Sequence, residues 1–349
     1  MKTISFLKQV IVSVCALGII SCDDTPEHDY QGYGAGVLVV CEGDFNSNNG
    51  AVTFISDSSV TQDVFSATNS RPLGDVVQSL EKGNENGYIV VNNSQKIEVV
   101  DLETFESVGI IQGLSYPRYA MVHDNGYVYV TNGNGHASNM VYVVNQNNLQ
   151  IEDSIAVGAG PDKIVSVDSK IFVTNRGGWI NDSTVSVISA QTHVVDTTIA
   201  VGDVPVSIVP DNTGDLIVVC LGLTTYDADW NPTIVSNSKI VRLDPETFEI
   251  EEVHSFDHQL ATTGSNIADV YENDIYYIDN GVYKLEQNAQ TPEKIIDGTF
   301  YGITVNPENG NIWVSNTEKE TQHSVVIYSS DGVKIDEYNT EKWPNGVVF

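Results

Sequence analysis

Basic side chains are scarce in this sequence of 349 residues, which contains 16 lysines and arginines against 47 aspartates and glutamates. The formal net charge at pH 7 is −31. A surface of that sign repels the phosphates of nucleic acids and the anionic head groups of lipids. The composition therefore argues against nucleic acid as a partner and against direct binding of the protein surface to phospholipid.

Long apolar runs are also missing. The longest, Val10–Ile20, is 11 residues long and follows two lysines, whereas a membrane-spanning helix needs about 20 apolar residues. The run therefore predicts a secretion signal over residues 1–21. Its end, Ile19-Ile20-Ser21-Cys22, resembles a bacterial lipobox. The resemblance implies that the thiol of Cys22 is lipidated; the alternative is an ordinary signal peptide cut nearby.

An acidic stretch follows Cys22. Residues 23–29 hold four acids and a proline and nothing apolar to bury, which predicts a flexible tether over residues 22–33. Without residues 1–21 the chain keeps 14 basic and 47 acidic side chains, a net charge of −33. The stretch resembles the export signal of Bacteroidota lipoproteins. It thus implies an anchor in the outer membrane that faces the cell exterior, with a plain solvated linker as the alternative.

A short β-rich run recurs seven times after the tether. The copies end at positions 41, 92, 132, 175, 220, 279 and 316, which are 51, 40, 43, 45, 59 and 37 residues apart. These spacings centre on the roughly 40–50 residues of a four-stranded propeller blade. Each run leads into two further strands, and Lys96–Glu106 and Lys239–Glu249 are closely similar copies of that second part.

A strand introduced by proline occurs five times, and four of the copies precede a run. The copies begin at Arg71-Pro72, Tyr116-Pro117, Gly160-Pro161, Val204-Pro205 and Trp343-Pro344. No further strands follow the last copy, and the first blade lacks an innermost strand before its run. Residues 345–349 should therefore complete the blade begun at 37–41. We therefore predict an all-β, monomeric, seven-bladed β-propeller over residues 34–349. Cys41 and Cys220 occupy equivalent places in separate blades, which argues against a disulfide.

Tyr129-Val130-Thr131-Asn132 is the literal YVTN signature, and Phe172-Val173-Thr174-Asn175 repeats it closely. The chain resembles the YVTN (YncE-like) propeller repeat proteins over roughly residues 36–349. With the lipobox and the acidic tether, it resembles Bacteroidota surface lipoproteins that capture corrinoids or ferric siderophores. That resemblance implies an outer-membrane TonB-dependent receptor as the partner.

One face of such a propeller gathers the loops before each innermost strand and the loops between the second and third strands. Three of these loops, 41–52, 175–184 and 220–239, are long, which is typical of functional segments. Three of the four arginines fall in loops of this face. We therefore expect a cationic ring of Arg71, Arg118, Lys163 and Arg176 with apolar walls of Tyr119, Trp179, Tyr226, Trp230 and Tyr301. The alternatives are internal salt bridges for the cations and capping of blade edges for the rings.

Sequence patterns for metal and catalytic sites are weak. The seven histidines form no HExxH motif, and no Gly-x-Ser-x-Gly elbow occurs. Asp227–Asn231 has the alternating oxygens of a calcium loop without its glycine and distal glutamate. A channel metal held by Glu42, Asn132, Asn175 and Asp279 is conceivable, but asparagines that end strands are explained by turn hydrogen bonds. We expect no catalytic residues, resident metal or cofactor.

These observations predict a cell-surface lipoprotein that binds a bulky nutrient and passes it to a transporter, rather than an enzyme. The ligand class, a corrinoid or an iron–siderophore, rests on the resemblance alone. Two alternatives stay open: a propeller for protein contact or adhesion in the cell envelope, and a metal-dependent hydrolase or lyase.

Overall fold

The computed structural model describes residues 32–56, 59–317 and 322–349. The predicted signal peptide, Cys22 and all but the last two residues of the predicted tether lie outside these ranges. Within them, no helix combines the length and the apolar character needed to cross a membrane.

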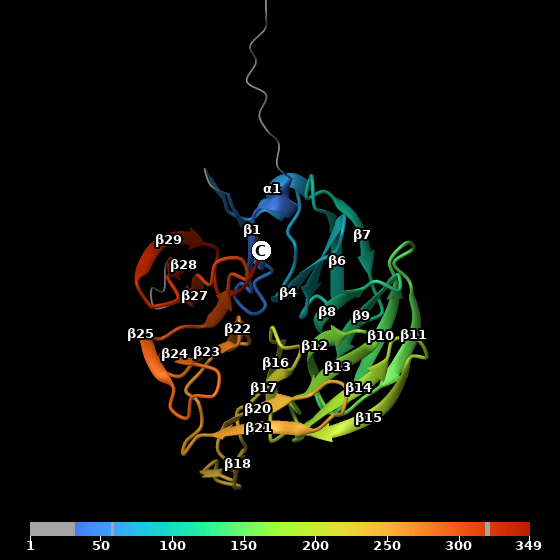
Figure 1. Cartoon of the computed structure of the whole chain (residues 1–349). Helices are drawn as coiled ribbons and strands as arrows, with labels where there is room; N and C mark the ends of the chain where they lie inside the picture. The colour runs from blue at the N-terminus through green and yellow to red at the C-terminus, as the bar shows by residue number, and fades with distance from the viewer. Residues whose placement is uncertain (1–31, 57–58, 318–321) are drawn as a thin grey trace, which may run out of the picture. The chain divides into compact units, whose positions relative to one another are not determined.

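Seven four-stranded antiparallel sheets form the blades of a propeller, as predicted. In Figure 1 they fan around a central axis, with β4, β8, β12, β16 and β22 toward the centre and β11, β15, β25 and β29 at the rim. The innermost strands are β30 (Pro344–Val348), β4 (Val77–Lys82), β8 (Pro117–His123), β12 (Pro161–Val167), β16 (Pro205–Pro210), β22 (Ala268–Tyr271) and β26 (Gly302–Val305). In this order they belong to the first to seventh blades.

The remaining strands follow outward in the same blade order. The second strands are β1 (Val37–Cys41), β5 (Asn86–Val91), β9 (Tyr127–Asn132), β13 (Lys170–Asn175), β17 (Leu216–Cys220), β23 (Asp274–Ile278) and β27 (Ile312–Asn316). The third strands are β2 (Ala51–Ile55), β6 (Lys96–Asp101), β10 (Met140–Asn145), β14 (Thr184–Ser189), β20 (Lys239–Leu243), β24 (Gly281–Leu285) and β28 (His323–Tyr328). The outermost are β3 (Val60–Thr61), β7 (Ser107–Ile111), β11 (Ile151–Ala156), β15 (Val194–Ala200), β21 (Ile250–Ser255), β25 (Glu293–Asp297) and β29 (Lys334–Thr340).

The C-terminal strand closes the ring. β30 pairs antiparallel with β1, with Leu38 opposite Val348 and Val39 opposite Val347. The first blade therefore contains strands from both ends of the propeller, and the predicted closure is confirmed.

The core lies between neighbouring blades, because the second strands carry continuous apolar runs that are buried on both faces. Every residue of the second strand β17 is buried, and in the first blade the third strand β2 is buried throughout as well. The outermost strands differ: β15 alternates between exposed and half-buried residues. This gradient is expected for sheets packed face to face around an axis, where the inner strands are covered by neighbouring blades and the outermost strands contact water.

Aspartate side chains fix the turns between the third and outermost strands. Asp101 accepts hydrogen bonds from the backbone N–H groups of Glu103 and Thr104 at 2.9 and 2.8 Å. Asp244 accepts the equivalent pair from Glu246 and Thr247. The repeated Asp-x-Glu-Thr pattern seen in the sequence is thus an Asx turn used in two blades.

Two details differ from the prediction. Four proline-led strands start at their proline, but the segment at Arg71-Pro72 does not, since β4 begins only at Val77. The preceding chain instead forms helix α1 (Val64–Asn69), capped by the side chain of Asp63, and a bend. A single turn of 3-10 helix, η1 (Tyr33–Ala35), precedes β1. Cys41 and Cys220 are buried and unpaired, as expected.

Candidate ligand-binding site

The start of each innermost strand lies beside the end of the second strand of its blade. Pro117 pairs with Asn132 in the third blade, and Pro161 pairs with Asn175 in the fourth. Loops that enter the innermost strands and loops that leave the second strands therefore share one face of the propeller, which we call the loop face.

A pocket of about 470 Å³ opens on the loop face between the third and fourth blades. Its walls include Arg118 and Arg176, with Tyr116, Asn134 and Trp179 beside them. Its volume falls in the range of about 300–1,000 Å³ that is usual for small-molecule sites.

The two arginines meet at one buried carboxylate. Arg118 Nε donates to Asp162 at 2.8 Å, and Arg176 contacts the other oxygen of the same carboxylate at 3.4 Å. Asp162 is only 1% exposed. Burial would raise the pKa of Asp162, but the positive charges of Arg118 and Arg176, together with that of Lys163, outweigh it and hold the pKa below its usual value. Arg118 also donates to the side-chain oxygen of Gln78 at 2.7 Å.

The backbone fixes the position of Trp179. Its N–H donates to the carbonyl of Asn134 at 3.1 Å, which ties a loop of the fourth blade to a loop of the third. Gly177 and Gly178 before it have φ values of 90° and 113°, which favour glycine. A Cβ atom on Gly178 would lie 2.4 Å from the carbonyl oxygen of Asn134. The two loops therefore interlock in a way that only glycine permits.

Tyr119 and Lys163 lie deeper than the pocket, in the central channel. The Lys163 ammonium sits 4.0 Å above the Tyr119 ring and bonds to the side-chain oxygen of Asn266 on the far side of the channel. Gln78 contacts the Tyr119 hydroxyl and Ser265 at 3.4 Å each. Gln78, Tyr119, Lys163 and Asn266 line a channel cavity of about 250 Å³.

Tyr301 lies on the other side of the channel mouth. Its hydroxyl donates to Glu42 at 2.8 Å. Burial raises the pKa values of both groups, although the charge of Arg118 and the hydrogen bond from Tyr301 partly offset the rise at Glu42. Tyr301 is therefore held by a partner of its own, across the mouth from the pocket.

The sequence profile of one protein family, described as a domain of unknown function (DUF5074), matches residues 35–349. The chain belongs to the DUF5074 family. No curated protein sequence matches it.

Many solved structures share the fold of this DUF5074 propeller, and three of them illustrate the likeness. A quinoprotein alcohol dehydrogenase-like protein from Bacteroides thetaiotaomicron has a TM-score of 0.68 at 14% identity, over 91% of this chain and 79% of its own. Hydrazine synthase from Kuenenia stuttgartiensis scores 0.57 at 17% identity, over 74% and 85%. The Dos1 propeller scores 0.56 at 13% identity, over 87% and 81%. At these identities the likeness establishes the fold alone.

Six of the nine predicted site residues lie outside the pocket of the DUF5074 propeller. Tyr119, Lys163 and Tyr301 belong to the channel and its mouth, and the other three lie farther away. Arg71 forms a bidentate ion pair with the buried Glu98 at 2.6 and 3.2 Å, and it also donates to Ser107 on the outermost strand of its blade. It therefore serves as an internal salt bridge, the alternative interpretation of the sequence. The cause is the late start of β4, which leaves Arg71 beside α1.

Tyr226 and Trp230 lie on a hairpin of the fifth blade made of β18 (Thr224–Tyr226) and β19 (Pro232–Ile234). Their rings are 6.1 Å apart, and Trp230 is 79% exposed. In Figure 1 this hairpin projects at the rim, away from β8 and β12. The predicted ring of nine residues is thus a cluster of three, Arg118, Arg176 and Trp179, with the channel residues behind it.

Most of the oxygen atoms considered for metal binding have other partners, but the buried side-chain oxygen of Asn175 has no hydrogen-bond partner among the described residues. Asp227 accepts the N–H groups of Asp229 and Asn231 within its own turn. The Asn132 side chain accepts from the N–H groups of Ser115 and Tyr116. Among the residues that the structure describes, no three histidine, cysteine or acidic side chains are grouped to hold a metal ion. The oxygen of Asn132 thus binds the loop that enters the innermost strand of its own blade, 16 and 17 residues earlier, and not a turn of its own segment.

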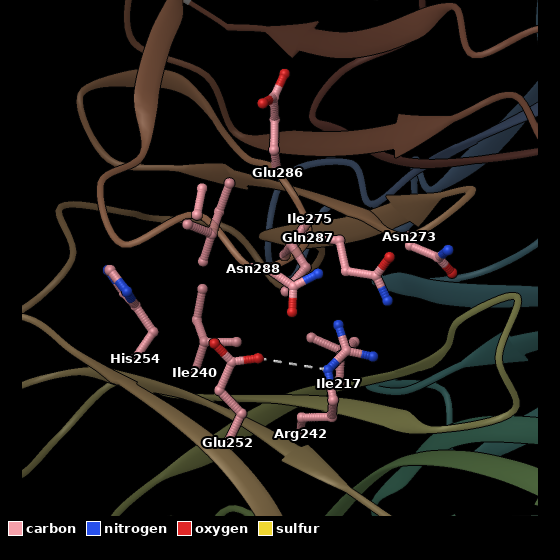
Figure 2. Close-up of a pocket in the computed structure, with 12 residues that line it drawn as sticks. Ile217, Ile240, Arg242, Glu252, His254, Asn273, Ile275, Glu286, Gln287 and Asn288 are labelled. Atoms are coloured by element: carbon pink, nitrogen blue, oxygen red, sulfur yellow. Dashed lines mark ion pairs between the residues drawn. The ribbon is translucent and has the colours of Figure 1, made fainter.

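A second, smaller hollow lies between the fifth and sixth blades. Figure 2 shows Arg242 and Glu252 on one side of it and Asn273, Gln287 and Asn288 on the other. Its volume is about 20 Å³, room for about one water molecule. Arg242 is bound there to Asp211, with Glu252 at 3.7 Å. This hollow is a seam between blades, too small for an organic ligand.

Sequence reasoning missed several lining groups: Tyr116, Asn134 and the glycines of both loops. Tyr116 could have been found, because it precedes the proline of a repeat just as Gly160 and Val204 do. The glycines could not, because their role depends on how loops from two blades approach each other. His136, which stacks on Trp179 with ring centroids 6.3 Å apart, was missed for the same reason.

Proposed function

We propose that this protein is a ligand-capturing lipoprotein, not an enzyme, and that it binds an organic ligand in the pocket between its third and fourth blades. The observation that carries the proposal is the convergence of Arg118, Arg176 and Trp179 in a 470 Å³ pocket on the loop face. Arginine and tryptophan are the residue types that dominate binding energy at recognition sites. They are displayed here on a rigid ring, as a binding site requires.

The ligand class follows from the resemblance to Bacteroidota surface lipoproteins. A corrinoid or an iron–siderophore complex would insert an acidic or aromatic part into the pocket, and the rest would project from the open mouth. Cys22 would anchor the propeller in the outer membrane, with the acidic tether leaving it free to turn toward a TonB-dependent transporter.

The hairpin β18–β19 supports contact with a protein partner. Tyr226, Trp230, Ile234 and Val235 are each more than half exposed. Apolar groups gathered on a surface in this way are typical of protein interaction sites. The hairpin extends a loop between the second and third strands, so it belongs to the same face as the pocket and could contact the transporter that receives the ligand.

The test is to isolate the full chain from the outer membrane of its own organism and to identify co-purifying small molecules by mass spectrometry. The expected result is one bound organic compound, with a red colour if it is a corrinoid or a ferric catecholate. Its binding should be lost in Trp179→Ala and retained in Trp230→Ala, a matched change of an exposed tryptophan elsewhere. A protein that carries no compound and binds neither cobalamin nor ferric catecholates would contradict the proposal.

Lipidation is tested separately. Metabolic labelling with a fatty acid should mark the wild type and not Cys22→Ala. External protease should release the propeller from intact cells. Labelling that survives the substitution, or a propeller that the protease reaches only after the cells are broken, would contradict the anchor or its orientation.

A further inference from the structure

We propose that the pocket between the third and fourth blades selects ligands in which a flat ring is joined to one anionic group, a carboxylate or a phosphate. The ring would stack on Trp179 and the anion would be bound by Arg176. The inference rests on the proposed function and narrows it to a chemical class.

Trp179 is built as a stacking surface. Trp179 is 75% exposed although it lines the pocket. His136 covers one side of the indole at an interplanar angle of 27°, and the backbone bond to Asn134 holds the residue in place. An indole that is fixed and supported from behind loses little entropy when a flat ring covers its open face.

The two arginines have different roles. Arg118 makes two short hydrogen bonds, to Asp162 and Gln78, and its side chain is 21% exposed. Arg176 makes one long contact at 3.4 Å and is 34% exposed. Among the residues that the structure describes, its guanidinium has no second hydrogen-bond partner. Arg176 is therefore the guanidinium available to a ligand, and Arg118 is a positioning residue that holds the carboxylate behind it.

The chemistry of a guanidinium decides the kind of anion. Its planar fork matches two oxygens of a carboxylate or a phosphate. The number of anionic groups is limited by the acids nearby. Asp162 lies directly behind Arg176, and Glu42 is close enough to act on the charge of Arg118. A second negative group placed deeper in the pocket would face these carboxylates, so one anionic group is favoured.

The test uses three defined probes: 2-naphthoate, its neutral amide 2-naphthamide, and cyclohexanecarboxylate, which keeps the acid and lacks the flat ring. Calorimetric titration of the full chain should give a dissociation constant of about 1 mM or below for naphthoate. Naphthamide and cyclohexanecarboxylate should each bind about tenfold more weakly, because each lacks one of the two interactions.

The variants assign each interaction to its residue. The Arg176→Gln variant should bind naphthoate and naphthamide with equal affinity. The Trp179→Ala variant should bind naphthoate and cyclohexanecarboxylate with equal affinity. Trp230→Ala and Lys294→Gln are matched controls on other surfaces and should leave all three affinities unchanged. Thermal melting of each variant shows that it is folded.

Three outcomes would overturn the inference: no saturable binding of naphthoate, equal affinity for acid and amide in the wild type, or a preference for the acid that survives Arg176→Gln. A native ligand that binds in the pocket but lacks a ring or an anionic group would also overturn it, while leaving the proposed function intact. Conversely, a protein that binds naphthoate but carries no ligand from its own membrane and binds neither cobalamin nor ferric catecholates would contradict the proposed function alone.

Discussion

Removal of the Arg118 side chain should expose how the pocket is held together. In Arg118→Ala the carboxylate of Asp162, 1% exposed, keeps only the long contact to Arg176 and the more distant charge of Lys163. The oxygen of Gln78 also loses its donor. Loss of one partner from a buried ion pair costs about 3–5 kcal/mol. Because Arg176 remains and Arg118 is itself partly exposed, we expect the lower end, about 3 kcal/mol.

The cost should depend on pH in a defined direction. The pKa of Asp162 is lowered in the folded protein, so its ionised form adds stability above its unfolded pKa of about 3.9. That contribution is lost as the pH falls through the lower pKa of the folded state. In the variant the carboxylate is poorly compensated and its pKa rises. The destabilisation should therefore be largest at neutral pH and should shrink toward about pH 4, where Asp162 becomes protonated in the variant.

Urea unfolding of residues 32–349, followed by circular dichroism at both pH values, measures this effect. The double variant Arg118→Ala, Asp162→Asn removes the uncompensated negative charge of Asp162 and should recover part of the lost stability at pH 7. An equal loss at the two pH values, or a double variant less stable than Arg118→Ala alone, would refute the assignment of Asp162 as the anion that the two arginines share.

Three further predictions concern the scaffold. Burial raises the thiol pKa values of Cys41 and Cys220 to about 12, so the native propeller at pH 8 should resist alkylation and react only when unfolded; mass spectrometry measures the labelling. Deletion of residues 344–349 removes β30 and opens the ring, and the truncated protein should lose its cooperative thermal transition, whereas a retained melting curve would disprove closure. Replacement of residues 226–232 by an Asn-Gly turn should shift the melting temperature by less than about 2 °C, because β18 and β19 pair only with each other.

Repeat periodicity made the fold predictable from the sequence. Each blade is a local unit of alternating strands and turns, and the spacing of its second strands can be counted directly. The pairing of β30 with β1 followed because one strand lacked successors and one blade lacked a first strand. Asp101 and Asp244 show the same locality, since each carboxylate binds N–H groups two and three residues later.

The site was only partly predictable, because it depends on contacts between blades. Arg118 and Arg176 could be placed on one face because both stand beside repeat positions. Arg71 could not, since the strand after it starts several residues later than in the other copies. Trp179 and Trp230 are similar in sequence context and in exposure, yet one lines the pocket and the other ends a projecting hairpin. The length of a loop in the sequence shows that residues are inserted, but it does not show where on the propeller they project.

Part of the acidic excess lies on the outermost strands, where it protects the sheet edges. Adjacent acids stand at the open sheet edges of three blades: Glu152-Asp153 on β11, Glu251-Glu252 on β21 and Asp336-Glu337 on β29. An open edge can recruit a strand from another molecule, and charged side chains on that edge oppose such pairing. Two copies meeting rim to rim would set carboxylates against carboxylates. Molecules packed side by side at high density would stay separate and present their loop faces unobstructed.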